Sequence, residues 1–177
     1  MVTPTIESER IVLKPLTVSD AEDIFKRWTQ DERVARYVRW FPHDSVEVTK
    51  QWLTEEVKNN LGGASYQWGF WLKETNYIFG SGGLVYNEEE DLFEIGYNIM
   101  HKYWNKGYTT EAAKRMLQFG QEELHQNEFV AWYAKDNPAS GRILEKCGFV
   151  FERDDIATKF DGVTKMEANF MRLQLGK

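Results

Sequence analysis

The chain has 177 residues, about the length of one domain, and 42% of them are hydrophobic and 28% charged, which excludes a disordered protein. Lys and Arg number 22 against 28 Asp and Glu, a net charge of −6. This acidic balance argues against a protein that coats duplex DNA, although a small anion can still be held locally. The single cysteine, Cys147, excludes an internal disulfide and indicates a reducing compartment.

No stretch of the sequence approaches the roughly 20 apolar residues of a membrane-spanning helix, and residues 1–10 lack the apolar run of a signal peptide. No linker or internal repeat divides the chain. We therefore expect one domain over residues 1–177, in the cytoplasm, with no membrane or nucleic-acid partner. A monomer and a homodimer both remain open.

The first third of the chain is predicted to hold a strand and two helices. Residues 10–16 are rich in β-branched side chains and predict a strand. The spacing of Ser and Glu at 19–22 predicts a capping box that opens a helix toward Trp28. A weaker box at 44–47 predicts a second helix, which Gly62 and Gly63 end.

The remainder alternates strands with two further helices. Three runs of aromatic and β-branched residues predict a meander of hairpins: 66–73, 77–86 and 92–100. After them come a helix over about 109–124, a strand over 129–134, a helix capped by Asn137 and ended by Gly148, and a hairpin of 149–156 and 163–173. The order predicts an α/β (α+β) fold with one central, mostly antiparallel sheet of about seven strands and flanking helices.

Several chemistries lack their sequence signals. The histidines His43, His101 and His125 are far apart and form no zinc motif, so we expect no metal site. The glycines of residues 80–83 lie inside a predicted strand with no helix after it, so close strand packing or a bulge is favoured over a phosphate loop. The acidic run 88–91 is interpreted as a solvated hairpin.

The informative segment is residues 94–112, where a strand leads through a short loop to the start of a helix. Unpaired amides and the positive end of a helix form an anion site at such a place. Gly107 lets the backbone approach a ligand, Lys106 adds a charge, and Thr109 and Thr110 add hydroxyls. An ordinary helix start explains the same residues, so this feature alone leaves both interpretations open.

Two longer blocks point to a family. The run Glu-Ile-Gly-Tyr at 94–97, followed by Tyr-Trp-Asn-Lys-Gly-Tyr-Thr-Thr-Glu-Ala at 103–112, resembles the GNAT acetyltransferases, in the branch of the ribosomal-protein N-terminal (RimJ/RimL-type) enzymes. Residues 137–149, Asn-Pro-Ala-Ser-Gly-Arg-Ile-Leu-Glu-Lys-Cys-Gly-Phe, resemble the second block of that branch. The resemblance covers nearly the whole chain and departs from the usual pattern at Asn105 and Thr109.

The resemblance implies that the chain is an N-acetyltransferase that takes acetyl-CoA as acetyl donor, without a metal. It implies that the amides of residues 105–110 hold the pyrophosphate and that the end of the preceding strand pairs with the pantetheine arm. The binding residues implied are Ile99, Met100, Trp104, Asn105, Lys106, Gly107, Tyr108, Thr109, Thr110, Asn137 and Ser140.

The resemblance also implies catalytic residues. Glu94 is the candidate base that removes the ammonium proton, and an ordinary outward-facing strand residue is the alternative. Ser140 is the candidate for positioning or protonating the leaving sulfur, with Tyr97 and Tyr108 as alternatives. We interpret Cys147 as a buried, inert thiol rather than a nucleophile.

The acceptor is a primary amine in every enzymatic interpretation. A protein N-terminus, a small polyamine and an amine antibiotic remain open, and so does a non-catalytic CoA-binding sensor. A phosphoryl-transfer enzyme would need a set of acidic metal ligands near the loop of residues 105–110, and the sequence shows none there. Aromatic residues of the first half are candidates for the acceptor pocket, with plain helix packing as the alternative: Trp28, Tyr37, Trp40, Phe41 and Trp52.

Overall fold

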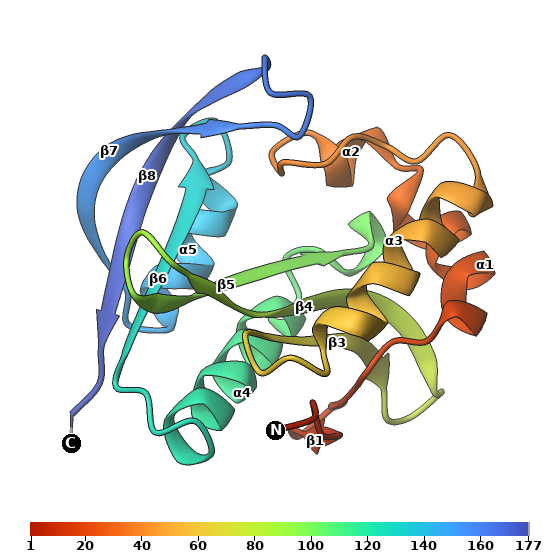
Figure 1. Cartoon of the computed structure of the whole chain (residues 1–177), viewed down its shortest axis with the longest axis horizontal. Coiled ribbons are helices and arrows are strands. Elements are labelled where there is room, and N and C mark those ends of the chain that lie inside the picture. Colours follow the sequence, from red (N-terminus) through yellow and green to blue (C-terminus); the bar gives the residue numbers. More distant parts are fainter. Residues whose placement is uncertain (177) are drawn as a thin grey trace.

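The computed structural model describes residues 1–176, which build one eight-stranded sheet with helices on both faces (Figure 1). The spatial order of the strands is β1-β2-β3-β4-β5-β6-β8-β7. Their bounds are β1 Ile6–Glu7, β2 Ile11–Lys14, β3 Ser65–Leu72, β4 Tyr77–Asn87, β5 Leu92–Ile99, β6 Glu128–Ala134, β7 Val150–Thr158 and β8 Lys165–Gln174. The prediction of a mostly antiparallel mixed sheet is confirmed, with β1 as an additional short edge strand.

The helices form two groups. One face of the sheet carries α1 (Ala21–Ile24) and α3 (Val46–Asn59), and the other carries α4 (Tyr108–Glu122) and α5 (Pro138–Lys146) (Figure 1). Shorter elements are η1 (Val18–Asp20), η2 (Phe25–Thr29), α2 (Glu32–Ala35) and η3 (His101–Tyr103). No helix among residues 1–176 is both long and apolar enough to cross a bilayer.

Two apolar clusters fill the space on the two sides of the sheet. Under α4 and α5, side chains such as Trp68, Phe79 and Phe129 are fully buried with Met116. Under α1 and α3, a smaller cluster forms around Trp28 and Leu53. At about 25 cal/mol per Å² of apolar surface, burial of this kind supplies the main favourable term of folding.

The N-terminal helices differ from the prediction in their caps. Thr17, not Ser19, starts the first helical segment, because the carboxylate of Asp20 accepts the Thr17 N–H at 2.8 Å. Ser45, not Asp44, occupies the N-cap position of α3. The single helix predicted toward Trp28 is divided into η1, α1 and the wider-turned η2. Sequence spacing missed α2, which is only one turn long.

The glycine run of residues 80–83 lies within β4, so the prediction of close strand packing is confirmed. A Cβ on Gly80 would come within 2.7 Å of the Asn98 carbonyl, and one on Gly82 within 2.6 Å of the Gly96 carbonyl. The register of β3 against β4 shifts between Phe70 and Trp71. These glycines therefore let β5 approach β4 closely at the edge of the site.

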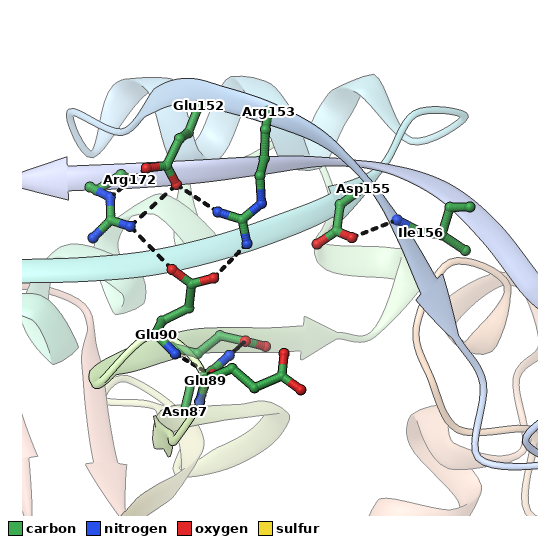
Figure 2. A network of polar contacts seen from close by, with 9 residues as sticks. Asn87, Glu89, Glu90, Glu152, Arg153, Asp155, Ile156 and Arg172 are labelled. Carbon is green, nitrogen blue, oxygen red and sulfur yellow. Dashed lines mark hydrogen bonds and ion pairs between the residues drawn. The ribbon is translucent and has the colours of Figure 1, made fainter.

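The turn between β4 and β5 is not simply solvated, which corrects the interpretation of residues 88–91. Figure 2 shows the Glu90 carboxylate between Arg153 of β7 and Arg172 of β8. Glu152 joins the same network through both arginines. The Glu90 side chain is only 16% exposed, so these ion pairs hold the turn against the last two strands.

Candidate active site

The site lies where β5 and β6 separate. These neighbouring parallel strands pair only at Phe93 with Phe129 and at Glu94 with Val130. Beyond Glu94 the two strands diverge, and a cavity of about 760 Å³ occupies the opening. The gap leaves one edge of β5 without a strand partner, and an extended ligand can occupy such an edge.

The cavity reaches both faces of the sheet, and its two ends are chemically different. Its α4 half is lined from the loop before α4 and from α5 by Trp104, Asn105, Lys106, Gly107, Thr109, Thr110, Asn137, Ser140, Arg142 and Lys146. Its α3 half is lined from α2, the α2–α3 connection, α3 and the β7–β8 connection by Arg33, Tyr37, Arg39, Trp40, Trp52, Glu56 and Phe160. Glu94 and Trp132 lie between the two halves.

The start of α4 has the geometry of an anion site. Gly107 has a φ of 79°, and Asn105 a φ of 58°, so both adopt the left-handed conformation that turns the chain into the helix. The first amides of α4 have no partner within the helix and point toward the loop. Three cations, Lys106, Arg142 and Lys146, border the same half of the cavity. The residues present thus suit a polyanionic ligand.

An ion pair fixes this helix start to the N-terminal strands. Glu111 accepts from the backbone amide and guanidinium of Arg10, each at 2.7 Å, and from the Ser8 hydroxyl at 2.7 Å. Arg10 also lies over the Tyr108 ring, 4.2 Å from its centroid. Burial pushes the pKa of Glu111 up, but the three donors outweigh it and hold the pKa below its ordinary value.

Two of the predicted binding residues, Tyr108 through its side chain and Met100 through its backbone, make contacts within the chain. Tyr108 packs against Phe79 and Tyr103 and does not line the cavity. The Met100 amide donates to the Phe79 carbonyl at 2.8 Å, and the Met100 carbonyl accepts from Tyr103 at 2.9 Å. Both backbone groups of Met100 thus have partners within the chain, and pairing of this strand end with a ligand stays a prediction. The Ile99 carbonyl accepts from the Trp104 indole at 3.0 Å.

Glu94 is held between two donors. The Trp132 indole donates to Oε1 at 3.1 Å, and the Asn87 side-chain amide donates to Oε2 at 2.9 Å. These bonds fix the carboxylate at the point where β5 and β6 begin to separate. Trp132 lies on β6 two residues beyond the last paired position, a contact that the sequence spacing did not indicate.

Ser140 and Tyr97 meet on the other side of β5. The Tyr97 hydroxyl is 3.3 Å from the Ser140 hydroxyl. Burial raises the pKa of Tyr97 above its ordinary value, so the phenol keeps its proton and can donate. Asn137 occupies the N-cap position of α5, as predicted, but its side chain makes no capping bond.

The aromatic residues of the first half divide into two sets. Tyr37, Trp40 and Trp52 line the cavity, whereas Trp28 is fully buried in the α1–α3 cluster and Phe41 lies outside the lining. Glu56, Trp132 and Phe160 were not predicted from the sequence, because each enters the cavity from a separate element. Burial raises the pKa of the Cys147 thiol to about 11, consistent with an inert thiol.

Lys159, in the β7–β8 connection, holds residues 35–39, which border the α3 half of the cavity. Figure 1 shows this connection beside α2. The Lys159 ammonium donates to the carbonyls of Ala35 at 2.9 Å and Val38 at 2.8 Å. The Phe160 amide donates to the Arg39 carbonyl at 2.9 Å. Among residues 1–176, no group of three His, Cys, Asp or Glu side chains could hold a metal ion.

Comparisons with known proteins agree with this geometry. Residues 10–150 match the family model described as the acetyltransferase (GNAT) domain. The chain is 29% identical over 147 residues, 82% of each sequence, to YoaA of Bacillus subtilis (strain 168), named an uncharacterized N-acetyltransferase.

Two solved structures share the fold. A GNAT-family acetyltransferase from Bacillus anthracis superposes with a TM-score of 0.83 at 24% identity, covering 97% of this chain and 98% of that one. RimL, a ribosomal L7/L12 α-N-protein acetyltransferase solved with coenzyme A, has a TM-score of 0.84 at 14% identity, with coverage of 97% and 98%.

Proposed function

The chain belongs to the GNAT acetyltransferase family and is an acetyl-CoA-dependent N-acetyltransferase, and from this premise we propose that it acetylates a primary amine bound in the α3 half of the cavity. The amine nitrogen attacks the thioester carbonyl directly. The C–N bond forms, the C–S bond breaks, and CoA leaves as its thiol. Glu94 and Ser140 carry the two proton-handling roles.

In this proposal the α4 half of the cavity holds acetyl-CoA. The amides of residues 105–110 and the positive end of α4 bind the pyrophosphate, and Lys106 adds its charge. The pantetheine arm lies along β5 at Ile99, with Trp104, Asn137 and Ser140 beside it. Acetyl-CoA supplies the activated acetyl group.

The acceptor must lose a proton before it attacks, because α-amines titrate near about 8 and lysine amines near about 10.4. Glu94 takes this proton, directly or through a water, because its carboxylate lies at the junction of the two halves. A backbone amide at the separation of β5 and β6 stabilises the oxyanion. Ser140, supported by Tyr97, positions and protonates the leaving sulfur.

A protein N-terminal α-amine and a small amine both remain candidates for the acceptor. A sensor that binds CoA without turnover would need no fixed carboxylate, whereas the two donors on Glu94 hold this one in place. This fixed carboxylate supports turnover rather than binding alone.

The observation that carries the proposal is the continuity of one cavity from the start of α4 past Glu94 to the aromatic α3 half. The test is to titrate the purified protein calorimetrically with acetyl-CoA, CoA and ATP, and then to follow thiol release with a panel of amines. Micromolar binding of acetyl-CoA and CoA, much weaker binding of ATP, and amine-dependent thiol release are expected. Thiol release that does not depend on any amine would refute the proposal.

A further inference from the structure

Glu56 is an acidic side chain without a partner in the α3 half of the cavity. It lies one helical turn after Trp52 on α3, and both residues line the cavity. Within residues 1–176 its carboxylate takes part in no hydrogen bond and no ion pair, and burial raises its pKa to about 7. A partly buried carboxylate normally pairs with a donor or a cation, so this one is open to a ligand.

A second unpartnered acceptor lies on the floor of the same space. Oδ1 of Asn98 is buried without a hydrogen bond. Asn98 shares a face of β5 with Gly96 and Glu94, because alternate strand residues point the same way. A Cβ on Gly96 would meet no atom within 4 Å, so the floor between Glu94 and Asn98 is open.

The walls of this space are aromatic. The His43 ring lies between those of Trp40 and Trp52, at centroid distances of 5.7 and 6.2 Å. Burial lowers the pKa of His43, which leaves its ring uncharged at neutral pH. Indole faces attract cations with a strength of about 0.5 to 2 kcal/mol.

Two cations line the α3 half, and neither is paired with Glu56. Arg33 pairs with Asp31 at 2.7 Å, and the Arg39 guanidinium lies over the Trp132 ring at 5.2 Å. The titratable groups that line the α3 half are Arg33, Tyr37, Arg39 and Glu56, with Glu94 at the junction. The raised pKa of Glu56 arises from burial, with no contribution from a neighbouring charge. Unpaired acceptors, indole walls and an uncompensated carboxylate together suit a cation.

We propose that Glu56, with the Trp52 indole one helical turn before it, forms a subsite for a second protonated nitrogen of the acceptor, which makes the acceptor a diamine or polyamine. This inference rests on the proposed function, since it places the reacting nitrogen at Glu94. Helix α3 covers β3, two strands away from β5. Strands lie about 4.8 Å apart, so the two nitrogens are separated by several carbons.

The experiment compares two amines of equal length. The protein saturated with CoA is titrated calorimetrically with 1,6-diaminohexane and with hexylamine, and the same two amines serve as acceptors in the thiol-release assay. We expect the diamine to bind about tenfold or more tightly, as for a hydrogen bond to a charged group. Its advantage is expected to decline below a pH of about 7, where the Glu56 carboxyl takes up a proton.

The test variant is Glu56→Gln, which keeps the shape and removes the charge. It is expected to reduce the ratio of diamine to monoamine affinity about tenfold. The matched control is Glu55→Gln, because Glu55 is exposed on the outer face of α3 and pairs with Lys58 at 2.9 Å. The control is expected to keep the ratio of the unaltered protein.

Three outcomes would overturn the subsite: no binding of either amine, equal affinity for both, or an undiminished diamine preference in Glu56→Gln. Failure of the proposed function is seen separately. Diamine binding that depends on Glu56, without amine-dependent thiol release, would leave the subsite standing and exclude acetyl transfer to such amines.

Discussion

The indole N–H of Trp132 donates to Oε1 of Glu94 at 3.1 Å, across the opening between β5 and β6. This bond joins Glu94, the last paired residue of β5, to a residue of β6 two positions beyond its partner Val130. It therefore orients the proposed base at the place where the sheet ceases to be continuous. The Glu94 side chain depends on β6 for its position as much as on its own strand.

Replacing Trp132 by Phe tests whether this bond serves catalysis. We expect kcat to fall about tenfold, since a charged acceptor loses one of its two donors. The affinity for acetyl-CoA and the unfolding temperature are expected to stay near those of the unaltered protein. In a double-mutant cycle, Trp132→Phe is expected to cost little further activity once Glu94 is Gln. Independent, additive losses would show that the indole does not act through Glu94.

The Ser140 and Tyr97 hydroxyls form the second proposed pair. Ser140→Ala is expected to lower turnover about 10²-fold with acetyl-CoA binding preserved, because the leaving sulfur loses its proton donor. Tyr97→Phe is expected to have a smaller effect, of about tenfold, if Tyr97 acts through Ser140. Ser45→Ala is a suitable control, because Ser45 starts α3 without a capping bond. Unchanged turnover in Ser140→Ala would remove Ser140 from the mechanism.

Glu111 gives a prediction of pH-dependent stability. Its pKa is held below the ordinary value, so its contribution is present above a pH of about 4.3 and is lost as the pH falls through the lowered value. Glu111→Gln is expected to destabilise the protein by about 1 to 2 kcal/mol at pH 7 and by much less near pH 3. Urea unfolding at the two pH values measures this. Glu122→Gln, at the exposed end of α4, is the control, and an equal loss at both pH values would contradict the explanation.

Lys159 gives a prediction about residues 35–39, which border the α3 half of the cavity. Lys159→Met leaves the Ala35 and Val38 carbonyls without their donor. We expect the KM for the acceptor amine to rise about tenfold, while kcat and acetyl-CoA affinity change little. Lys159→Arg is expected to restore part of the affinity, and the exposed Lys165→Met serves as control. A loss confined to kcat would place Lys159 outside acceptor binding.

The fold was largely predictable from local signals. Alternating aromatic strands and the Asn137–Pro138 start of α5 gave the sheet and its last helices to within one or two residues. The errors arise where packing overrides local spacing. The N-cap residue of the first helical segment is Thr17, paired with Asp20, rather than Ser19. The four-residue α2 is too short to show a helical period.

The site was predictable where its residues fall within the two sequence blocks, residues 94–112 and 137–149, which supply Glu94, Asn137 and Ser140 to the cavity. Gly107, Lys106, Thr109 and Thr110 follow one another and line the cavity together. Glu56 and Trp132 enter the same cavity as Glu94 from α3 and β6, so their place in the site depends on tertiary structure. The engagement of Met100 within the chain likewise depends on the turn that Tyr103 closes.

The central claim is tested most directly by Glu94→Gln, with acetyl-CoA affinity and amine-dependent thiol release measured on the same preparation. Glu88→Gln, on the exposed turn before β5, is the matched control. We predict that turnover falls about 10²-fold or more while acetyl-CoA binds as before. Turnover equal to that of the control, with binding intact, would show that Glu94 is not the base.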